Sequence, residues 1–306
     1  MPKNRRTRCW IPLCFLWWAA AAPAFAVDGA APTKAVFAPA FALRPVAAAR
    51  VIRADAAFAD YEDAKGHQGS TIATTLFASA KLSPSLAAFG RIGLNGNHPP
   101  VGLAGSAFVN PVAGALYAFS PAPSWKMAAL LAAAVPVGMG GGNTPDPAES
   151  AAAKSGVLAR SAMDNAMFAV NDLVVFPGFG AAYVTPGWTA QVEATVLQLA
   201  RIRAEKTQPD ASKTNLTAGA AFSLWITSYF AATAELRYQR WLSTPAAVRA
   251  DPAARDTLSF AIGPRFTVKL GEGVTARPGI AFTRGLDAPM TAKQYQIAYL
   301  DIPIAY

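Results

Sequence analysis

The strongest constraint on the fold is an alternation of side chains between Thr257 and Leu270. Apolar side chains fall on every second residue there, and small or polar residues stand between them. A helix repeats every ~3.6 residues and cannot give this pattern, so it predicts a β-strand. The strand exceeds the five or six residues that are usual in soluble sheets, by roughly a factor of two. It reaches the length of about 9–11 residues that a membrane-crossing strand needs. Because lipid offers no partner to backbone groups, a sheet that crosses a membrane must close into a barrel.

The same alternation recurs along the chain and predicts the other strands. They are expected near 46–60, 68–82, 86–95, 107–119, 125–138, 167–184, 188–204, 214–227 and 230–242, with two more after the turn at 271–273. Short turns and longer loops alternate between them, as in outer-membrane barrels. We therefore predict an all-β fold, a closed antiparallel transmembrane β-barrel of about 12 strands, with short periplasmic turns and longer extracellular loops. The alternative is a soluble β-sandwich with core aromatics.

The start of the chain predicts export. Lys3, Arg5, Arg6 and Arg8 precede an apolar stretch, and Ala24-Phe25-Ala26 resembles a cleavage site, so residues 1–26 are expected to be a cleaved secretory signal peptide. A membrane anchor is the alternative. Residues 27–45 are expected to be an Ala/Pro-rich, mobile periplasmic lead-in, and residues 46–306 the barrel. Cleavage removes both cysteines, Cys9 and Cys14, and lowers the formal net charge from +9 to +5. The predicted location is the bacterial outer membrane, reached by the general secretory route.

The polar face of the strands carries charged residues. Strand parity predicts that these line the lumen: Arg53, Asp55, Arg91, Glu193, Arg201, Arg203, Glu235, Arg237, Arg265, Lys269, Arg277 and Asp301. They are structural if they form ion-pair networks that fill a narrow barrel, and functional if they form a basic pathway for solutes. Barrels of about eight strands are filled and those of about sixteen are open, so both interpretations stand. An open lumen with this excess of basic residues is expected to prefer anions.

Aromatic residues cluster near the predicted strand ends. Amphipathic rings settle at the two membrane–water interfaces. An aromatic girdle is therefore predicted from Trp125, Trp188, Trp225, Tyr229, Phe230, Tyr238, Trp241 and Tyr306.

No catalytic constellation is visible in the sequence. His67 and His98 are the only histidines, both fall in predicted loops, and neither has a second ligand at zinc-like spacing. We expect no enzyme activity, no metal and no cofactor. Basic residues are scattered along strands rather than clustered with aromatics, so no nucleic-acid binding is expected.

Three stretches resemble a known class of proteins: Lys81-Leu82-Ser83-Pro84-Ser85-Leu86 as a turn between strands, Asn110 to Phe119 as the returning strand, and Val135-Pro136-Val137-Gly138 at the end of the fifth strand. The pattern resembles bacterial outer-membrane β-barrels of the transporter or "phenol degradation pathway" (MetA-pathway) type and spans most of residues 46–306. The resemblance implies passage of small hydrophobic or aromatic compounds, and supplies no catalytic residues.

Together these features predict a passive channel or transporter for small solutes, anionic or aromatic. The alternative is a closed structural outer-membrane protein whose loops bind partners or surfaces. Expected partners are the lipid bilayer, lipopolysaccharide, a small solute and the barrel assembly machinery, which would read the C-terminal strand ending in Tyr306. A terminal aromatic residue on an alternating strand resembles the signal used by that machinery.

Overall fold

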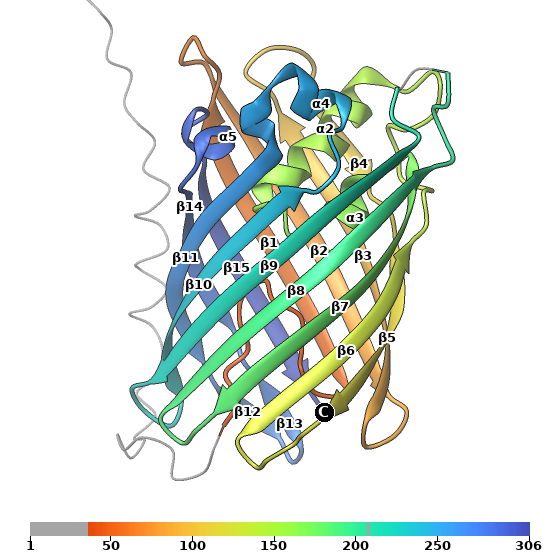
Figure 1. The fold of residues 1–306 in the computed structure, drawn as a ribbon. Coiled ribbons are helices and arrows are strands. Elements are labelled where there is room, and N and C mark those ends of the chain that lie inside the picture. The colour runs from red at the N-terminus through yellow and green to blue at the C-terminus, as the bar shows by residue number, and fades with distance from the viewer. Residues whose placement is uncertain (1–35, 207–208) are drawn as a thin grey trace, which may run out of the picture.

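Antiparallel pairing runs around a closed ring in the computed structural model, which describes residues 36–206 and 209–306 (Figure 1). The first strand pairs with the second on one side and with the last on the other, so the sheet has no free lateral edge there. Closure satisfies the backbone groups that lipid cannot satisfy. The predicted signal peptide, residues 1–26, lies outside the described residues.

Twelve strand positions make the ring, which confirms the predicted fold class and strand number. Nine of the positions are single strands: β1 (Val51–Glu62), β2 (Gln68–Lys81), β3 (Leu86–His98), β6 (Trp125–Ala134), β7 (Asp172–Val184), β8 (Trp188–Arg201), β9 (Ser212–Trp225), β10 (Phe230–Trp241) and β15 (Gln296–Ala305). The other three positions are each split into two pieces: β4 (Gly105–Phe108) with β5 (Val112–Phe119), β11 (Asp256–Phe266) with β12 (Val268–Gly271), and β13 (Val274–Ala276) with β14 (Gly279–Gly285).

The break between β4 and β5 has a local cause at Asn110. Its side-chain nitrogen donates to the carbonyl of Ala169 at 2.8 Å, and its side-chain oxygen accepts the N–H of Gly138 at 3.1 Å. The next residue, Pro111, has no N–H to give to a sheet. The predicted strand over 107–119 is therefore two strands, because Asn110 is tied to the long loop instead of to a neighbouring strand.

The outer surface of the barrel is apolar. Side chains on one parity of each strand are exposed there, including Ile72, Leu94, Leu131, Val192 and Ile262. The opposite parity faces inward and carries Thr, Ser, Asn and charged residues along with Ala. This two-faced pattern is the one that membrane barrels show.

Short helices lie at the end of the barrel that carries the long loops, while the C-terminus lies at the other end with the short turns (Figure 1). They are α2 (Pro147–Ala159), α3 (Asn165–Phe168), α4 (Ala246–Ala250), η1 (Pro252–Arg255) and α5 (Ala288–Thr291). Among the described residues, no helix has the length and apolar character to span a membrane. The predicted sixth strand, 167–184, begins only at Asp172 because α3 occupies residues 165–168.

Helix α2 packs into the mouth of the barrel. Its N-cap Asp146 accepts the backbone N–H groups of Ala148 and Glu149, which satisfies two donors at the helix start. Small residues on its buried face permit a close approach to β3: a Cβ added at Gly156 would lie 2.0 Å from the side-chain nitrogen of Asn95. The loop between β6 and β7 thus folds inward rather than standing free.

Residues 36–49, here called the N-terminal segment, run inside the lower half of the barrel (Figure 1). Phe41 is fully buried and Leu43 nearly so. This corrects the expected periplasmic lead-in for the described part, residues 36–45. The segment is apolar, and the lumen offers it both apolar surface and polar partners for its backbone. The predicted first strand, 46–60, begins only at Val51, because residues 46–49 belong to the segment inside the barrel.

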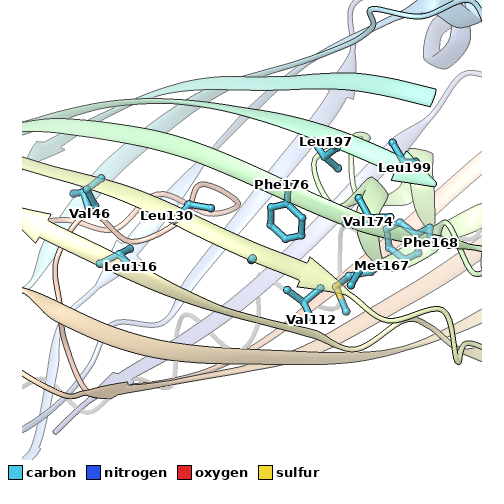
Figure 2. Close-up of a cluster of buried hydrophobic side chains, with 14 of the residues drawn as sticks. Val46, Val112, Leu116, Leu130, Met167, Phe168, Val174, Phe176, Leu197 and Leu199 are labelled. Atoms are coloured by element: carbon cyan, nitrogen blue, oxygen red, sulfur yellow. The ribbon is translucent and has the colours of Figure 1, made fainter. Parts of the chain in front are cut away.

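The main apolar cluster joins the N-terminal segment to the inward-folded loop (Figure 2). Val46 from the segment lies beside Leu116 and Leu130 of the wall, and Met167 and Phe168 come from α3. The lumen is therefore packed with side chains over much of its length.

Candidate functional site in the lumen

The N-terminal segment is held by acidic side chains of the barrel wall. The Glu235 carboxylate accepts the backbone N–H of Phe41 at 2.6 Å and that of Ala42 at 3.1 Å. Glu193 accepts the backbone N–H of Arg44 at 2.6 Å, and pairs with its guanidinium at 2.8 Å. Buried backbone groups need partners, and here side chains supply what a strand would supply in a sheet.

Basic and aromatic side chains of the wall bind the carbonyls of the same segment. Arg265 donates to Ala40 at 3.2 Å and lies over the ring of Phe41, 4.7 Å from its centroid. Arg53 donates to the carbonyl of Phe41. The indole N–H of Trp225 donates to Val36 at 3.1 Å. The segment is thus fixed by hydrogen bonds at several points, yet it is not part of the sheet.

A second set of charges enters from the long loop. Arg160, directly after α2, forms an ion pair with Asp55 of β1 and a second with Asp164 at 2.8 Å. Arg91 of β3 bridges the same two carboxylates. Because four charges share these contacts, the loop and two strands are locked together in the centre of the lumen.

The register of β1 and β15 places two carboxylates opposite each other, and arginines neutralise them. Asp55 and Asp301 stand directly opposite each other in the β1–β15 ladder. Arg53 pairs with Asp301 at 2.7 Å and Arg265 does so at 2.6 Å. Like charges placed opposite each other are destabilising, and these guanidinium groups neutralise them.

Every acidic side chain in this central group has an arginine partner, including Glu235, which pairs with Arg237 at 2.7 Å. Of the two interpretations left open by the sequence, the described structure shows the ion-pair network. The excess of basic charge that predicted anion preference is largely compensated in this closed arrangement.

Two of the cavities in the described structure lie beside the N-terminal segment. The larger, about 280 Å³, lies between the segment and the wall at the end of the barrel with the short turns, and its lining includes Phe37, Ala47, Phe77, Arg277, Pro303 and Ala305. The smaller, about 50 Å³, is lined by Phe89, Leu116, Asp164 and Phe176 among others. Both cavities touch Arg44, Pro45, Phe77 and Arg91.

Most of the predicted lining residues face the lumen. These are Arg53, Asp55, Arg91, Glu193, Glu235, Arg237, Arg265, Arg277 and Asp301. Arg201, at the outer end of β8, has a carboxylate oxygen of Asp172 at 3.7 Å.

Two predicted lining residues lie elsewhere. Lys269 is exposed on the β12–β13 hairpin, because that hairpin extends beyond the part of the barrel that encloses the lumen. Arg203 lies after the end of β8 and donates to the carbonyls of Pro136 and Gly138 at 3.0 and 2.8 Å. It fastens the long loop instead of lining a pathway.

Five of the predicted girdle residues lie on the outward parity near strand ends: Trp125, Trp188, Phe230, Tyr238 and Tyr306. Tyr229 lies in the turn between β9 and β10 and is exposed. Trp225 and Trp241 do not belong to the girdle. Trp225 is buried and binds the N-terminal segment, and Trp241 packs against the internal apolar cluster. Strand alternation puts both rings inward, since Leu224 and Leu242 beside them are the exposed neighbours.

Sequence reasoning missed the residues that close the lumen. Arg44 is the one charged residue between Val36 and Ala49, and Arg160 and Asp164 stand four apart in an otherwise mostly apolar stretch. Isolated charges in apolar segments were the available signal, because such charges need partners when they are buried.

Neither histidine lies in the lumen. His67 pairs with Asp63 at 2.9 Å in the β1–β2 loop, where a hydrogen bond from the backbone N–H of His67 lowers the pKa of Asp63. His98 is the last residue of β3 rather than a loop residue. Among the described residues, no group of three or more His, Cys, Asp or Glu is placed to hold a metal ion.

No protein-family model matches this chain, and no curated protein matches its sequence. Among solved structures, the NanC porin matches with a TM-score of 0.48 and 8% identity, over 83% of this chain and 98% of that one. The translocator domain of the autotransporter NalP from Neisseria meningitidis matches with a TM-score of 0.45 and 12% identity, over 84% of this chain and 87% of that one. A Pseudomonas aeruginosa FadL homologue matches with a TM-score of 0.41 and 8% identity, over 84% of this chain and 90% of that one. The barrel assignment of this chain rests on its own strand pairing.

Proposed function

We propose that this protein is an outer-membrane channel or transporter for small solutes, and that the N-terminal segment closes its lumen in the described state. The observation that supports the proposal is the way in which the segment is held. No strand pairing joins residues 36–49 to the wall; the contacts are side-chain hydrogen bonds, one ion pair and apolar packing. Such contacts can be broken without unfolding the sheet.

The apolar outer surface and the rings near the strand ends support insertion in a bilayer. An outer-membrane location would follow from the predicted signal peptide and the general secretory route. The resemblance to barrels of the MetA-pathway type, with its implied aromatic substrates, is part of this proposal. So are contacts with lipopolysaccharide and with the assembly machinery, and the expectation that the protein is no enzyme.

An engineered disulfide between the N-terminal segment and the barrel wall tests the proposal. A Cβ added at Gly180 would lie 2.9 Å from Cγ1 of Val46, which is close enough for the pair Val46→Cys and Gly180→Cys to form a disulfide. The chain has cysteines only at positions 9 and 14, both within the predicted signal peptide. The engineered bond would then be the only disulfide in the mature protein.

Single-channel conductance in a planar bilayer is the measurement. The oxidised double variant should not conduct, and reduction should restore the conductance of the unmodified protein. Each single cysteine variant serves as a control that lacks the bond. Equal conductance before and after reduction, with the disulfide verified by mass, would show that the segment is not the closure.

The second candidate is a closed structural barrel whose loops bind a partner. The compensated charges in the lumen favour it, because a permanently filled barrel needs such compensation. Absence of conductance steps from folded, reduced protein would support this candidate and reject the channel.

A further inference from the structure

The larger cavity has the features of a small-molecule site. Its volume of about 280 Å³ exceeds the roughly 150 Å³ of an engineered apolar cavity that holds benzene. Much of its lining is apolar and comes from the N-terminal segment, β2 and β15, for example Phe37, Leu43, Phe77 and Pro303. Ligand pockets combine such surface with a few polar groups that fix orientation.

Arg277 supplies a polar group of this kind. It lies between β13 and β14, half-buried, and lines the cavity. Its backbone is engaged: the N–H donates to Pro303 at 2.8 Å, and the carbonyl accepts from Arg265 at 2.6 Å. Its position is therefore fixed at the cavity wall.

The side chain of Arg277 is not compensated as the other arginines of the cavity are. Its Nε is buried without a hydrogen-bond partner. Arg44, Arg53 and Arg91 are all paired with carboxylates. Within residues 36–206 and 209–306, none of the ion pairs includes Arg277. Partial burial of a charge without a carboxylate partner is costly, so an anion bound at this guanidinium would be stabilising.

We infer that the cavity binds a small organic carboxylate, with the anionic group on Arg277 and a compact apolar body against Phe37, Phe77 and Pro303. A guanidinium matches a carboxylate geometrically, because two parallel N–H groups meet its two oxygens. The inference deepens the proposed function, on which it rests for its biological meaning, by naming the class of solute.

The N-terminal segment forms one side of this cavity through Ala40, Ala42 and Ala47. A bound carboxylate would contact both the segment and the wall. The site would thus lie at the closure itself, where a solute enters or leaves.

Calorimetric titration of the folded, full-length mature protein in detergent tests the inference, with benzoate as the probe and benzamide as its neutral counterpart. We expect benzoate to bind at least tenfold more tightly than benzamide. Arg277→Gln should weaken benzoate binding at least tenfold and leave benzamide binding unchanged. Arg277→Lys should keep part of the preference, because it keeps the charge without the paired N–H geometry.

Two further variants serve as controls. Lys269→Gln removes the same charge from the exposed β12–β13 hairpin and should leave benzoate binding unchanged. Ala47→Trp places a ring in the cavity from the segment and should abolish binding of both probes while keeping Arg277. Heat-modifiable gel migration shows that each variant is folded.

The inference is overturned if benzoate and benzamide bind equally, if neither binds, or if folded Arg277→Gln binds benzoate as the unmodified protein does. Binding in detergent does not require conduction. If the protein binds benzoate but never conducts, the channel function is rejected and the carboxylate site stands. If it conducts but shows no preference for benzoate over benzamide, only the carboxylate site is rejected.

Discussion

The guanidinium of Arg44 lies 2.8 Å from a carboxylate oxygen of Glu193, and this is the one ion pair between the described N-terminal segment and the barrel wall. The same carboxylate accepts the backbone N–H of Arg44 at 2.6 Å. Glu193 of β8 therefore binds both the backbone N–H and the guanidinium of Arg44. Both side chains are largely buried, so water screens the pair little.

Glu193→Gln should loosen the segment and raise the frequency of channel openings. The change removes the ion pair and leaves the Arg44 guanidinium without its carboxylate, at a cost of about 3–5 kcal/mol for a buried pair. Single-channel recordings measure the opening frequency. Glu272→Gln, in the exposed turn between β12 and β13, is the matched control and should not alter it. Unchanged opening in Glu193→Gln would contradict the role of this contact.

Arg265→Ala should destabilise the barrel rather than change ion selectivity. Arg265 and Asp301 are both fully buried, and the variant leaves Asp301 with Arg53 alone. The expected loss is about 3–5 kcal/mol. Urea unfolding in lipid vesicles, followed by tryptophan fluorescence, measures it.

A double-mutant cycle tests the coupling between these residues. Adding Asp301→Ala to Arg265→Ala should recover part of the loss, because the remaining carboxylate is then gone. Additive losses in the double variant would show that the two side chains act independently.

Leu236→Arg should impair insertion. Leu236 stands at the middle of β10 on the outward face, with 42% of its surface exposed. A basic residue on the lipid face at mid-depth costs about 2–4 kcal/mol. The fraction of heat-modifiable barrel in membranes measures insertion. Glu62→Arg, at the outer end of β1, places the same residue near the interface and should be tolerated. Equal insertion of both variants would argue against a lipid-facing Leu236.

Tyr306→Ala should slow assembly while leaving the finished barrel intact. The ring of Tyr306 is 55% exposed, and its backbone N–H donates to Arg50 at 3.2 Å. The substitution keeps that bond and removes the exposed ring that the assembly machinery is proposed to read. Pulse-chase appearance of the heat-modifiable form measures the rate. Tyr229→Ala removes another exposed ring near the short turns and is the control; an equal delay in both variants would indicate a general interfacial effect.

The sequence by itself determined the barrel. Period-two alternation, as in Thr257–Leu270, fixes which side chains meet lipid, and the alternation of short turns and long loops fixes the order of the strands. These are local properties, because each residue's face depends only on its place in its own strand. The lumen-facing placement of Glu235, Arg237 and Arg265 follows from the same rule.

The tertiary structure decided what fills the barrel. In residues 36–49 the isolated charge of Arg44 is a local sign of burial, but it does not identify the place. An apolar segment without a period has no defined partner until the ring closes around it. The pairing of Arg160 with Asp55 likewise depends on a loop folding inward across 105 positions of sequence. Charge balance in the lumen arises from such distant contacts. The inward residues could therefore be assigned from the sequence, whereas their ion pairing could not, and neither could the absence of Arg277 from the ion pairs of the described residues.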